Sequence, residues 1–329
     1  MTPLWACDRP LRFRARRRFA VGLSLLIVVG TVSRGGPTLA GSKTTKPAAT
    51  RRRGSTARPV RIAAVGDLAC PTRQAASTDQ CHQGSVSDLL VADGSLAAFL
   101  ALGDLQYDSG DAADFSMSYK QSYGRLKRIT HPAPGNHEYV TPGATGYYDY
   151  FGVRAGPRGK GWYSAGLAPG WHLVVLNSNC DEVGCAVGSE QETWLRRDLA
   201  QSGAPCTIAI WHHPRFSSGT THGDAPDTTA LWDALDAAGT ELVLEGHEHQ
   251  YERFAPRRAD GSLGGGPMSF VVGTGGKSLY PFGTPKPGSA VRIANQFGYL
   301  SLVLTDRQYT WGFVGEDGVV SDRGSGRCH

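Results

Sequence analysis

Five short apolar runs in this 329-residue sequence each end in side chains that commonly bind metal ions. They lead into Gly66-Asp67, Gly103-Asp104 with Tyr107 nearby, Gly135-Asn136-His137-Glu138, His212-His213 and Gly246-His247-Glu248-His249. An apolar run that stops abruptly predicts a buried strand, and the turn that follows delivers polar side chains to the edge of a sheet. One such turn is commonplace. The same layout repeated five times predicts that these side chains form one site.

Helical and extended patterns alternate along most of the chain. We expect strands over residues 61–65, 95–102, 172–177, 207–211 and 242–244, and helices over 85–91, 114–129, 189–199 and 227–238. Ser189 and Asp227 are expected to cap the last two helices, Ser189 in a capping box with Glu192. Aromatic clusters at 147–151 and 162–164 favour hairpin and core positions. From Met268 onward only strands and turns are expected, so the pattern indicates one α/β domain over residues 60–329.

The N-terminal 40 residues have the layout of a signal peptide. Arginines that include residues 16–18 precede an apolar segment at 19–30, and small residues follow near 38–40. The adjacent arginines also fit the twin-arginine export route, and the alternative is an uncleaved membrane anchor. Residues 41–59 are basic and lack apolar periodicity, which predicts a disordered linker. We therefore expect a secreted or cell-envelope protein without a stable membrane span in its mature form.

The net charge changes sign once this N-terminal region is set aside. The whole chain carries +5, residues 1–58 supply +12 of this, and residues 59–329 are left with −7. The basic pI of about 8.8 therefore does not describe the folded domain. Composition gives no support for nucleic acid as a dedicated partner, and it does not indicate an oligomeric state.

Six cysteines remain after the predicted signal peptide. An even number in an exported chain favours disulfides over a thiolate metal site. Proximity in the sequence pairs Cys70 with Cys81 and Cys180 with Cys185, which leaves Cys206 to pair with Cys328 near the C-terminus. Six cysteines allow about 15 pairings in all, so this one is a hypothesis.

The candidate metal ligands are numerous enough to predict two ions. They are Asp67, Asp104, Tyr107, Asn136, His212, His247 and His249. Their oxygen and nitrogen donors suit Fe, Zn, Mn or Mg better than copper(I) or an iron–sulfur cluster. Seven donors exceed what one transition-metal ion takes, but they suit two ions that share a carboxylate. Asp104 is the natural bridge.

The five blocks, in this order over residues 62–253, resemble those of the calcineurin-like metallophosphoesterases. Most members of that family carry a histidine two residues after the first aspartate, where this chain has Ala69. In the purple acid phosphatase branch a tyrosine three residues after the bridging aspartate replaces it, and Tyr107 stands there. The resemblance implies an α/β fold of two packed mixed β-sheets flanked by helices, an α/β/β/α sandwich.

The resemblance also implies how the donors divide between the two ions. Asp67, Tyr107 and His249 would hold the first ion, Asp104 would bridge, and Asn136, His212 and His247 would hold the second. A tyrosinate favours Fe(III) in the first position, paired with Fe(II), Zn or Mn in the second.

The function that follows from the resemblance is an exported phosphomonoesterase similar to an acid phosphatase. It would hydrolyse small-molecule phosphate esters by attack of a metal-bound hydroxide, with Asp104 holding both ions. His137 would orient the substrate or protonate the leaving group, and His222 is the other candidate for that role. One alternative is a phosphodiesterase acting on nucleotides, glycerophosphodiesters or lipids. The other is an extracellular binding protein without turnover.

The remaining polar residues of the motifs have simpler interpretations. His213 is expected to be structural, and Glu138 and Glu248 to support their turns. The glycine-rich segment 273–278 is interpreted as a turn, because it lacks the spacing of a phosphate-binding loop. Arg215 stands where the plant and animal relatives usually have an aromatic residue, and either lies on the pocket rim or is solvated.

Overall fold

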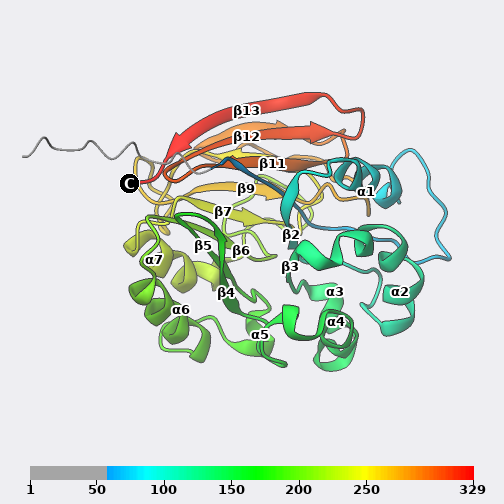
Figure 1. Cartoon of the computed structure of the whole chain (residues 1–329), viewed down its shortest axis with the longest axis horizontal. Helices are drawn as coiled ribbons and strands as arrows, with labels where there is room; N and C mark the ends of the chain where they lie inside the picture. Colours follow the sequence, from blue (N-terminus) through cyan, green and yellow to red (C-terminus); the bar gives the residue numbers. More distant parts are fainter. Residues whose placement is uncertain (1–57) are drawn as a thin grey trace, which may run out of the picture. The chain divides into compact units, whose positions relative to one another are not determined.

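Two mixed β-sheets form the centre of the domain (Figure 1). The computed structural model describes residues 58–329; the predicted signal peptide, and the predicted linker up to residue 57, lie outside the described residues. The first sheet has the order β13-β12-β11-β1-β2-β3 and the second the order β10-β8-β9-β7-β6-β5-β4. The strands are β1 (Val60–Val65), β2 (Leu96–Leu102), β3 (Thr130–Ala133), β4 (Tyr163–Ala168), β5 (Trp171–Val175), β6 (Cys206–Ile210), β7 (Leu242–Glu245), β8 (Tyr251–Phe254), β9 (Met268–Val272), β10 (Ser289–Ile293), β11 (Gly298–Leu304), β12 (Gln308–Gly315) and β13 (Val320–Arg327).

Each sheet contains a parallel block. In the first, β1 pairs in parallel with β2, and β2 with β3; in the second, β5, β6, β7 and β9 are parallel neighbours. Parallel strands end at the same edge of their sheet, so the residues that follow them are brought together. This arrangement explains why the motifs found after separate apolar runs can belong to one site.

The buried side chains of the second sheet alternate between two cores. On β6, Ile208 and Ile210 pack in the cluster shared with the first sheet, whereas Ala209 between them joins the cluster beneath α6 (Glu190–Gln201) and α7 (Thr229–Ala237). Successive side chains of a strand point to opposite faces, so both faces of this sheet must be apolar. That requirement produces the continuous apolar runs seen in the sequence.

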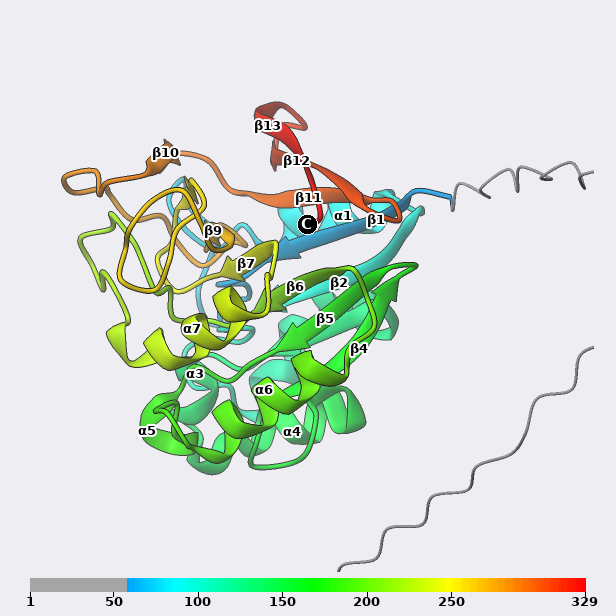
Figure 2. The same cartoon turned by 90° about the vertical axis from the view of Figure 1, so that its left-hand side faces the viewer.

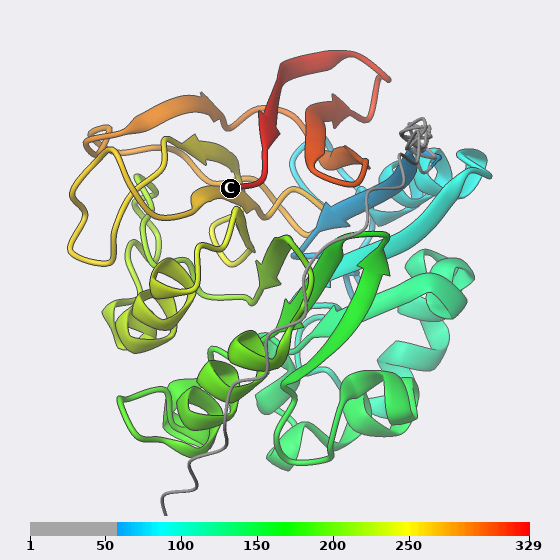
Figure 3. The same ribbon diagram turned by 60° about the vertical axis from the view of Figure 1, so that its left-hand side comes forward.

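Helices cover the outer faces of the sheets. Figure 2 shows α6 and α7 lying along β4 to β7, and Figure 3 shows them again on that side, with the helices between β2 and β4 on the other. The other helices are α1 (Gln83–Ala92), α2 (Ala112–Met117), α3 (Asn136–Tyr139), α4 (Thr145–Phe151) and α5 (Cys180–Val183), with 3₁₀ turns η1 (Tyr119–Gln121), η2 (Tyr123–Ile129), η3 (Pro142–Ala144), η4 (Gly152–Ala155) and η5 (Pro226–Thr228). The expected α/β fold of two packed mixed sheets flanked by helices is confirmed.

Three local predictions were wrong. The single helix expected over 114–129 is divided into α2, η1 and η2. The backbone N–H of Tyr119 donates to the side chain of Gln106 and not to a helical carbonyl. The Ser118 hydroxyl, beside it, donates to the carbonyl of Cys70, so long-range bonds interrupt the helix here. The aromatic segment 147–151 is helical, not a hairpin, because α4 buries most of its rings in the core. Asp227 lies inside η5, and Thr228 occupies the N-cap of α7 without a side-chain cap bond.

The three predicted disulfides are present, linking Cys70 with Cys81, Cys180 with Cys185, and Cys206 with Cys328. The capping prediction for α6 is half right: Ser189 accepts from the N–H of Glu192, but the Glu192 carboxylate accepts from Gly188 instead of Ser189. Within the described residues, no helix has the length and apolar character needed to cross a bilayer.

Candidate metal centre

All seven candidate ligands lie just beyond the carboxyl ends of parallel strands. Asp67 follows β1, Asp104 and Tyr107 follow β2, Asn136 follows β3, His212 follows β6, and His247 and His249 follow β7. The first three strands belong to one sheet and the other two to the second. The site therefore forms where the ends of the two packed sheets face each other.

Three of these residues have left-handed backbone conformations. The φ angles are 61° for Asp67, 49° for Asp104 and 72° for His247. Non-glycine residues rarely adopt positive φ, and such strained positions cluster at functional sites. Each of the three follows a glycine in the sequence.

Glycines that precede candidate ligands in the sequence leave room for the ligands of neighbouring strands. A Cβ atom on Gly135 would lie 2.1 Å from Oδ1 of Asp104, and one on Gly103 would lie 2.5 Å from Nδ1 of His212. Gly103 also has a φ of +87°. Any larger side chain at either position would displace a candidate ligand, which explains the Gly-Asp and Gly-Asn pairs found after the apolar runs.

Four donors make up a first set around the Tyr107 hydroxyl. This oxygen lies 2.9 Å from Oδ1 of Asp67, 2.9 Å from Oδ2 of Asp104 and 3.0 Å from Nε2 of His249. The His249 Nε2 atom is 3.2 Å from Oδ1 of Asp67. All four side chains are almost fully buried.

A second set surrounds Nε2 of His212. This nitrogen lies 3.2 Å from Oδ2 of Asp104, 3.2 Å from Oδ1 of Asn136 and 3.2 Å from Nδ1 of His247. The Asp104 Oδ2 atom therefore lies next to Tyr107 of the first set and next to His212 of the second.

These spacings fit two metal ions. Donors bound to one ion at about 2.1 Å and at right angles lie roughly 3 Å apart, which is the spacing within each set. Both sets combine hard oxygen donors with imidazole nitrogen, a combination suited to Fe, Zn or Mn. One carboxylate oxygen common to both sets is what a bridging ligand requires.

Neighbouring groups hold the imidazole rings in place. Nδ1 of His212 is 2.9 Å from the Leu102 carbonyl oxygen, which leaves Nε2 directed at the donor set. Nδ1 of His249 is 2.8 Å from the Ser278 hydroxyl, and the Tyr280 ring stacks on the imidazole at 4.0 Å between centroids. Such partners fix the orientation of a ligating histidine and its tautomer.

Burial and mutual interaction shift the pKa values of the site. Burial would raise the pKa of Asp104, but His212 and other nearby histidines hold it well below its usual range. Burial opposes the charging of His212, but the Asp104 carboxylate raises its pKa to about 9. Burial, Asp104 and Asp67 together raise the pKa of the Tyr107 hydroxyl. Metal binding must displace protons from such groups, so the affinity for metal will depend on pH.

The two histidines considered for substrate contact lie beside the donor sets. The Nδ1 atom of His137 is 2.6 Å from the Asp108 carbonyl, and Nε2 is 3.9 Å from Oδ2 of Asp104. The His222 ring lies 4.1 Å from that of His247, measured between centroids. Partial burial of this ring lowers the pKa of His222.

The acidic residues of the motifs hold turns, as expected. The buried Glu138 carboxylate accepts from the backbone N–H groups of Gly135, Leu105 and Gln106. Glu248 accepts from the N–H groups of His222 and Gly223, so it positions the loop that carries His222.

The structure also shows the surroundings of the glycine-rich segment, Arg215 and His213. The segment 273–278 is irregular, without a following helix. Arg215 is not freely solvated: its guanidinium donates to the Ala259 carbonyl and stacks on Phe216. His213 was expected to be structural, but it lies beside the candidate ligands. One of its ring nitrogens is within 4.8 Å of ring nitrogens of His212 and His247.

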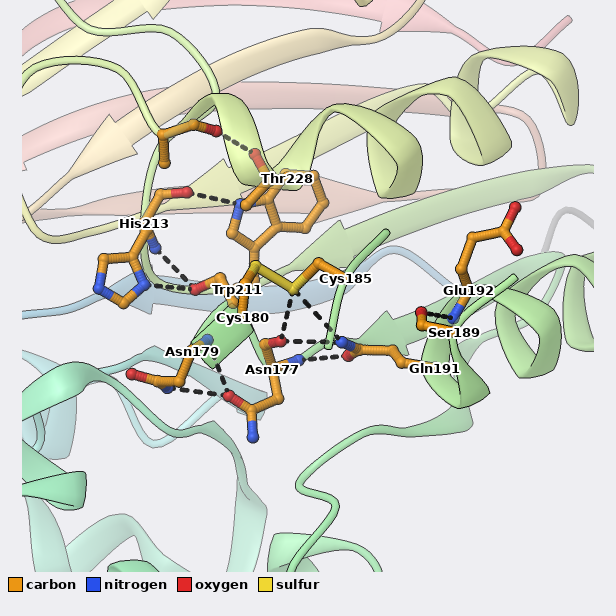
Figure 4. Close-up of a disulfide and its surroundings, with 12 residues drawn as sticks. Asn177, Asn179, Cys180, Cys185, Ser189, Gln191, Glu192, Trp211, His213 and Thr228 are labelled. Atoms are coloured by element: carbon orange, nitrogen blue, oxygen red, sulfur yellow. Dashed lines mark hydrogen bonds between the residues drawn. A yellow bond between two sulfur atoms is a disulfide. The ribbon is translucent and has the colours of Figure 1, made fainter. Parts of the chain in front are cut away.

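Some residues at the site were missed by sequence analysis. Ser178 and Asn179 follow β5 just as the motifs follow the other strands, and Ser178 Oγ lies 2.8 Å from Nδ1 of His213. Figure 4 shows Asn179 and His213. The position of Ser178 and Asn179 after an apolar run was a usable signal. Ser278 and Tyr280, by contrast, come from the glycine-rich segment and the residues after it, which sequence analysis interpreted only as a turn.

Comparison with known proteins agrees with this geometry. The family model for calcineurin-like phosphoesterases matches residues 60–251. Purple acid phosphatase 15 of Arabidopsis thaliana is 30% identical over 66% of this chain and 45% of its own length. Purple acid phosphatase 21 of the same plant is 27% identical over 82% of this chain and 65% of its own length. The chain thus spans about half to two thirds of these relatives.

The fold is also similar to that of a solved plant enzyme. The purple acid phosphatase PPD1 from yellow lupin seeds superposes with a TM-score of 0.66 at 19% identity, covering 82% of this chain and 54% of that one. The family match covers more than half of the chain, and its end coincides with the last of the sequence blocks. This chain therefore belongs to the calcineurin-like phosphoesterase family, in its purple acid phosphatase-like branch.

Proposed function

We propose that this protein is an exported phosphomonoesterase with a binuclear metal centre, acting on small-molecule phosphate esters. The observation that carries the proposal is the position of Asp104 Oδ2 between two donor sets of about equal spacing. The family match and its purple acid phosphatase relatives support the same reading. The three disulfides support export to an oxidising compartment.

Fe(III) is proposed for the set of Asp67, Asp104, Tyr107 and His249, and Fe(II), Zn or Mn for the set of Asp104, Asn136, His212 and His247. Two such ions supply a deprotonated water nucleophile near neutral pH and neutralise charge on the phosphoryl group. The protein contributes a buried carboxylate that keeps both positions adjacent, and ring orientations fixed by Leu102 and Ser278.

His137 is proposed to orient the substrate or to protonate the leaving group. Its Nδ1–H donates to the Asp108 carbonyl, which leaves Nε2 on the side of Asp104. His222 is a second proton donor candidate on the loop held by Glu248.

The test compares 4-nitrophenyl phosphate with bis(4-nitrophenyl) phosphate, using metal-loaded and chelator-treated protein. We expect metal-dependent hydrolysis of the monoester, with a higher kcat/KM than for the diester, and loss of this activity in Asn136→Ala. A faster diester reaction would replace the proposal with a phosphodiesterase. Absence of metal-dependent hydrolysis of both would reject enzymatic function and favour a binding protein.

A further inference from the structure

A cavity of about 440 Å³ opens beside the second donor set. Asn136, a proposed ligand, forms part of its wall, as does His213, which lies close to His212 and His247. The opposite wall is α5, and η5 closes a third side. The cavity is therefore continuous with the place where a bound phosphoryl group would lie.

The inner surface of this cavity is rigid and neutral. Ser178 and Asn179 follow β5, and Asn179 donates to the side chain of Asn177 and to the Pro134 carbonyl. The Cys180–Cys185 disulfide closes the α5 segment that follows them in the chain (Figure 4). Small hydrogen-bonding side chains held in this way present hydroxyl and amide groups to a ligand without adding charge.

The charged residues of the cavity are all acidic. Asp181 and Glu182 come from α5, and Asp227 comes from η5. None of the three accepts a hydrogen bond or forms an ion pair within the described part of the chain, and no lysine or arginine lines the cavity. Their negative charge therefore remains uncompensated at the mouth.

We infer that this cavity receives the alcohol portion of the phosphate ester and selects for alcohols that are neutral or positively charged. The inference rests on the proposed function and adds a substrate class to it. The phosphoryl group bears negative charge in every ester, so it cannot distinguish one substrate from another. The selection therefore depends on the charge of the alcohol portion. Additional phosphate or carboxylate groups on the alcohol would be repelled by Asp181, Glu182 and Asp227, whereas an ammonium group would be attracted.

A series of three esters of two-carbon alcohols tests the inference: O-phosphoethanolamine, ethyl phosphate and phosphoglycolate. We expect kcat/KM to fall in that order, with roughly a tenfold difference between the first and last at low ionic strength. The difference should shrink as salt is added, because the carboxylates are exposed. Binding of 2-aminoethylphosphonate and 3-phosphonopropionate, measured by calorimetry, gives the same comparison without turnover.

In the triple variant Asp181→Asn, Glu182→Gln, Asp227→Asn, the kcat/KM values of the cationic and anionic esters should become nearly equal. The affinities for the two phosphonates should become nearly equal as well. The variant's kcat/KM for ethyl phosphate, whose alcohol portion carries no charge, should change less than that for either charged ester. Asp233→Asn, which removes an exposed carboxylate of α7 outside the cavity, is the matched control and should preserve the order. Equal affinity of the wild-type protein for the two phosphonates, or a preference that survives the triple variant, would overturn the inference. Failure to hydrolyse ethyl phosphate and the 4-nitrophenyl esters, with the phosphonate preference intact, would instead reject the proposed function alone.

Discussion

The hydroxyl oxygen of Tyr107 lies 2.9 Å from Oδ2 of Asp104, although the two residues are only three apart in sequence. The chain turns directly after β2 and brings the tyrosine back over the aspartate. The same hydroxyl is 2.9 Å from Oδ1 of Asp67 on the neighbouring strand end. A tyrosine placed in this way can bind the same ion as both carboxylates.

Tyr107→Phe is therefore expected to change the colour of the iron-loaded protein. A phenolate bound to Fe(III) gives a ligand-to-metal charge-transfer band in the visible spectrum, and removing the only nearby hydroxyl of the first set abolishes it. The measurement is a visible spectrum together with metal analysis of the same sample.

Tyr280→Phe is the control for this change. Its ring stacks on His249 at 4.0 Å, but its hydroxyl is not among the donors of either set. The band should persist in this variant. Persistence of the band in Tyr107→Phe would show that another group binds the ferric ion.

Asp104→Ala should lose both ions, because its Oδ2 atom belongs to both donor sets. Asn136→Ala removes a donor from the second set only, at 3.2 Å from His212 Nε2. Elemental analysis after dialysis should therefore show a larger loss of metal in Asp104→Ala than in Asn136→Ala. Equal losses would argue against a bridging role.

The grouping of the candidate ligands was largely predictable because these residues follow a local rule. A glycine and then a candidate ligand after a buried strand is visible in the sequence, and a side chain at Gly103 or Gly135 would collide with a candidate ligand. The supporting residues Ser278 and Tyr280 were not predictable, since only the folded chain brings their loop to His249.

The fold was less predictable where packing overrides local preference. β13 reads as a polar, glycine-rich tail, yet it pairs along β12. A Cβ on Gly324 would lie 2.1 Å from the Trp311 ring, and one on Gly326 would lie 2.3 Å from the Tyr309 ring. These glycines make room for aromatic rings of the neighbouring strand, a cross-strand effect that no local pattern reports.

His137→Ala should lower kcat while leaving the metal content unchanged. Loss of a positioned proton donor typically costs about 10²–10⁴-fold in rate. The Nε2 atom of His137 is 3.9 Å from Asp104 Oδ2, which is longer than the 2.9–3.2 Å spacings within the two donor sets. A parallel His222→Ala variant should show which histidine acts on the leaving group: the acting one loses more rate with alkyl than with 4-nitrophenyl phosphate, because the alkoxide needs protonation more.

The disulfides should differ in their contribution to stability. The Cys206–Cys328 bond closes a segment of 122 residues, whereas Cys180–Cys185 closes one of 5. Loop-closure entropy assigns about 5 kcal/mol to the first and about 2 kcal/mol to the second. Chemical denaturation of the two double Cys→Ser variants should show a larger decrease in the free energy of unfolding when the Cys206–Cys328 bond is removed. The reverse order would mean that native contacts, and not chain entropy, dominate.

An ion pair between the two sheets should make the free energy of unfolding decrease at acidic pH. Asp322 on β13 accepts from the Tyr251 hydroxyl and from Nε of Arg253 on β8, both at 2.7 Å. Burial opposes ionisation of Asp322, but these bonds prevail and lower its pKa. A carboxyl whose pKa is lowered on folding stabilises the folded state fully above its unfolded value of about 3.9, and loses that contribution as pH falls through the folded value.

Asp322→Asn should therefore reduce the free energy of unfolding by about 2 kcal/mol at pH 7, since Arg253 loses its buried partner. The difference from the wild type should narrow below about pH 4, where the wild-type carboxyl also becomes protonated. Urea denaturation at pH 7 and at pH 3 measures both values. Asp306→Asn, an exposed aspartate in the β11–β12 turn, is the control and should leave stability within about 0.5 kcal/mol of wild type. A difference for Asp322→Asn that is equal at the two pH values would show that shape and hydrogen bonding, and not the charge of Asp322, hold β13 to β8.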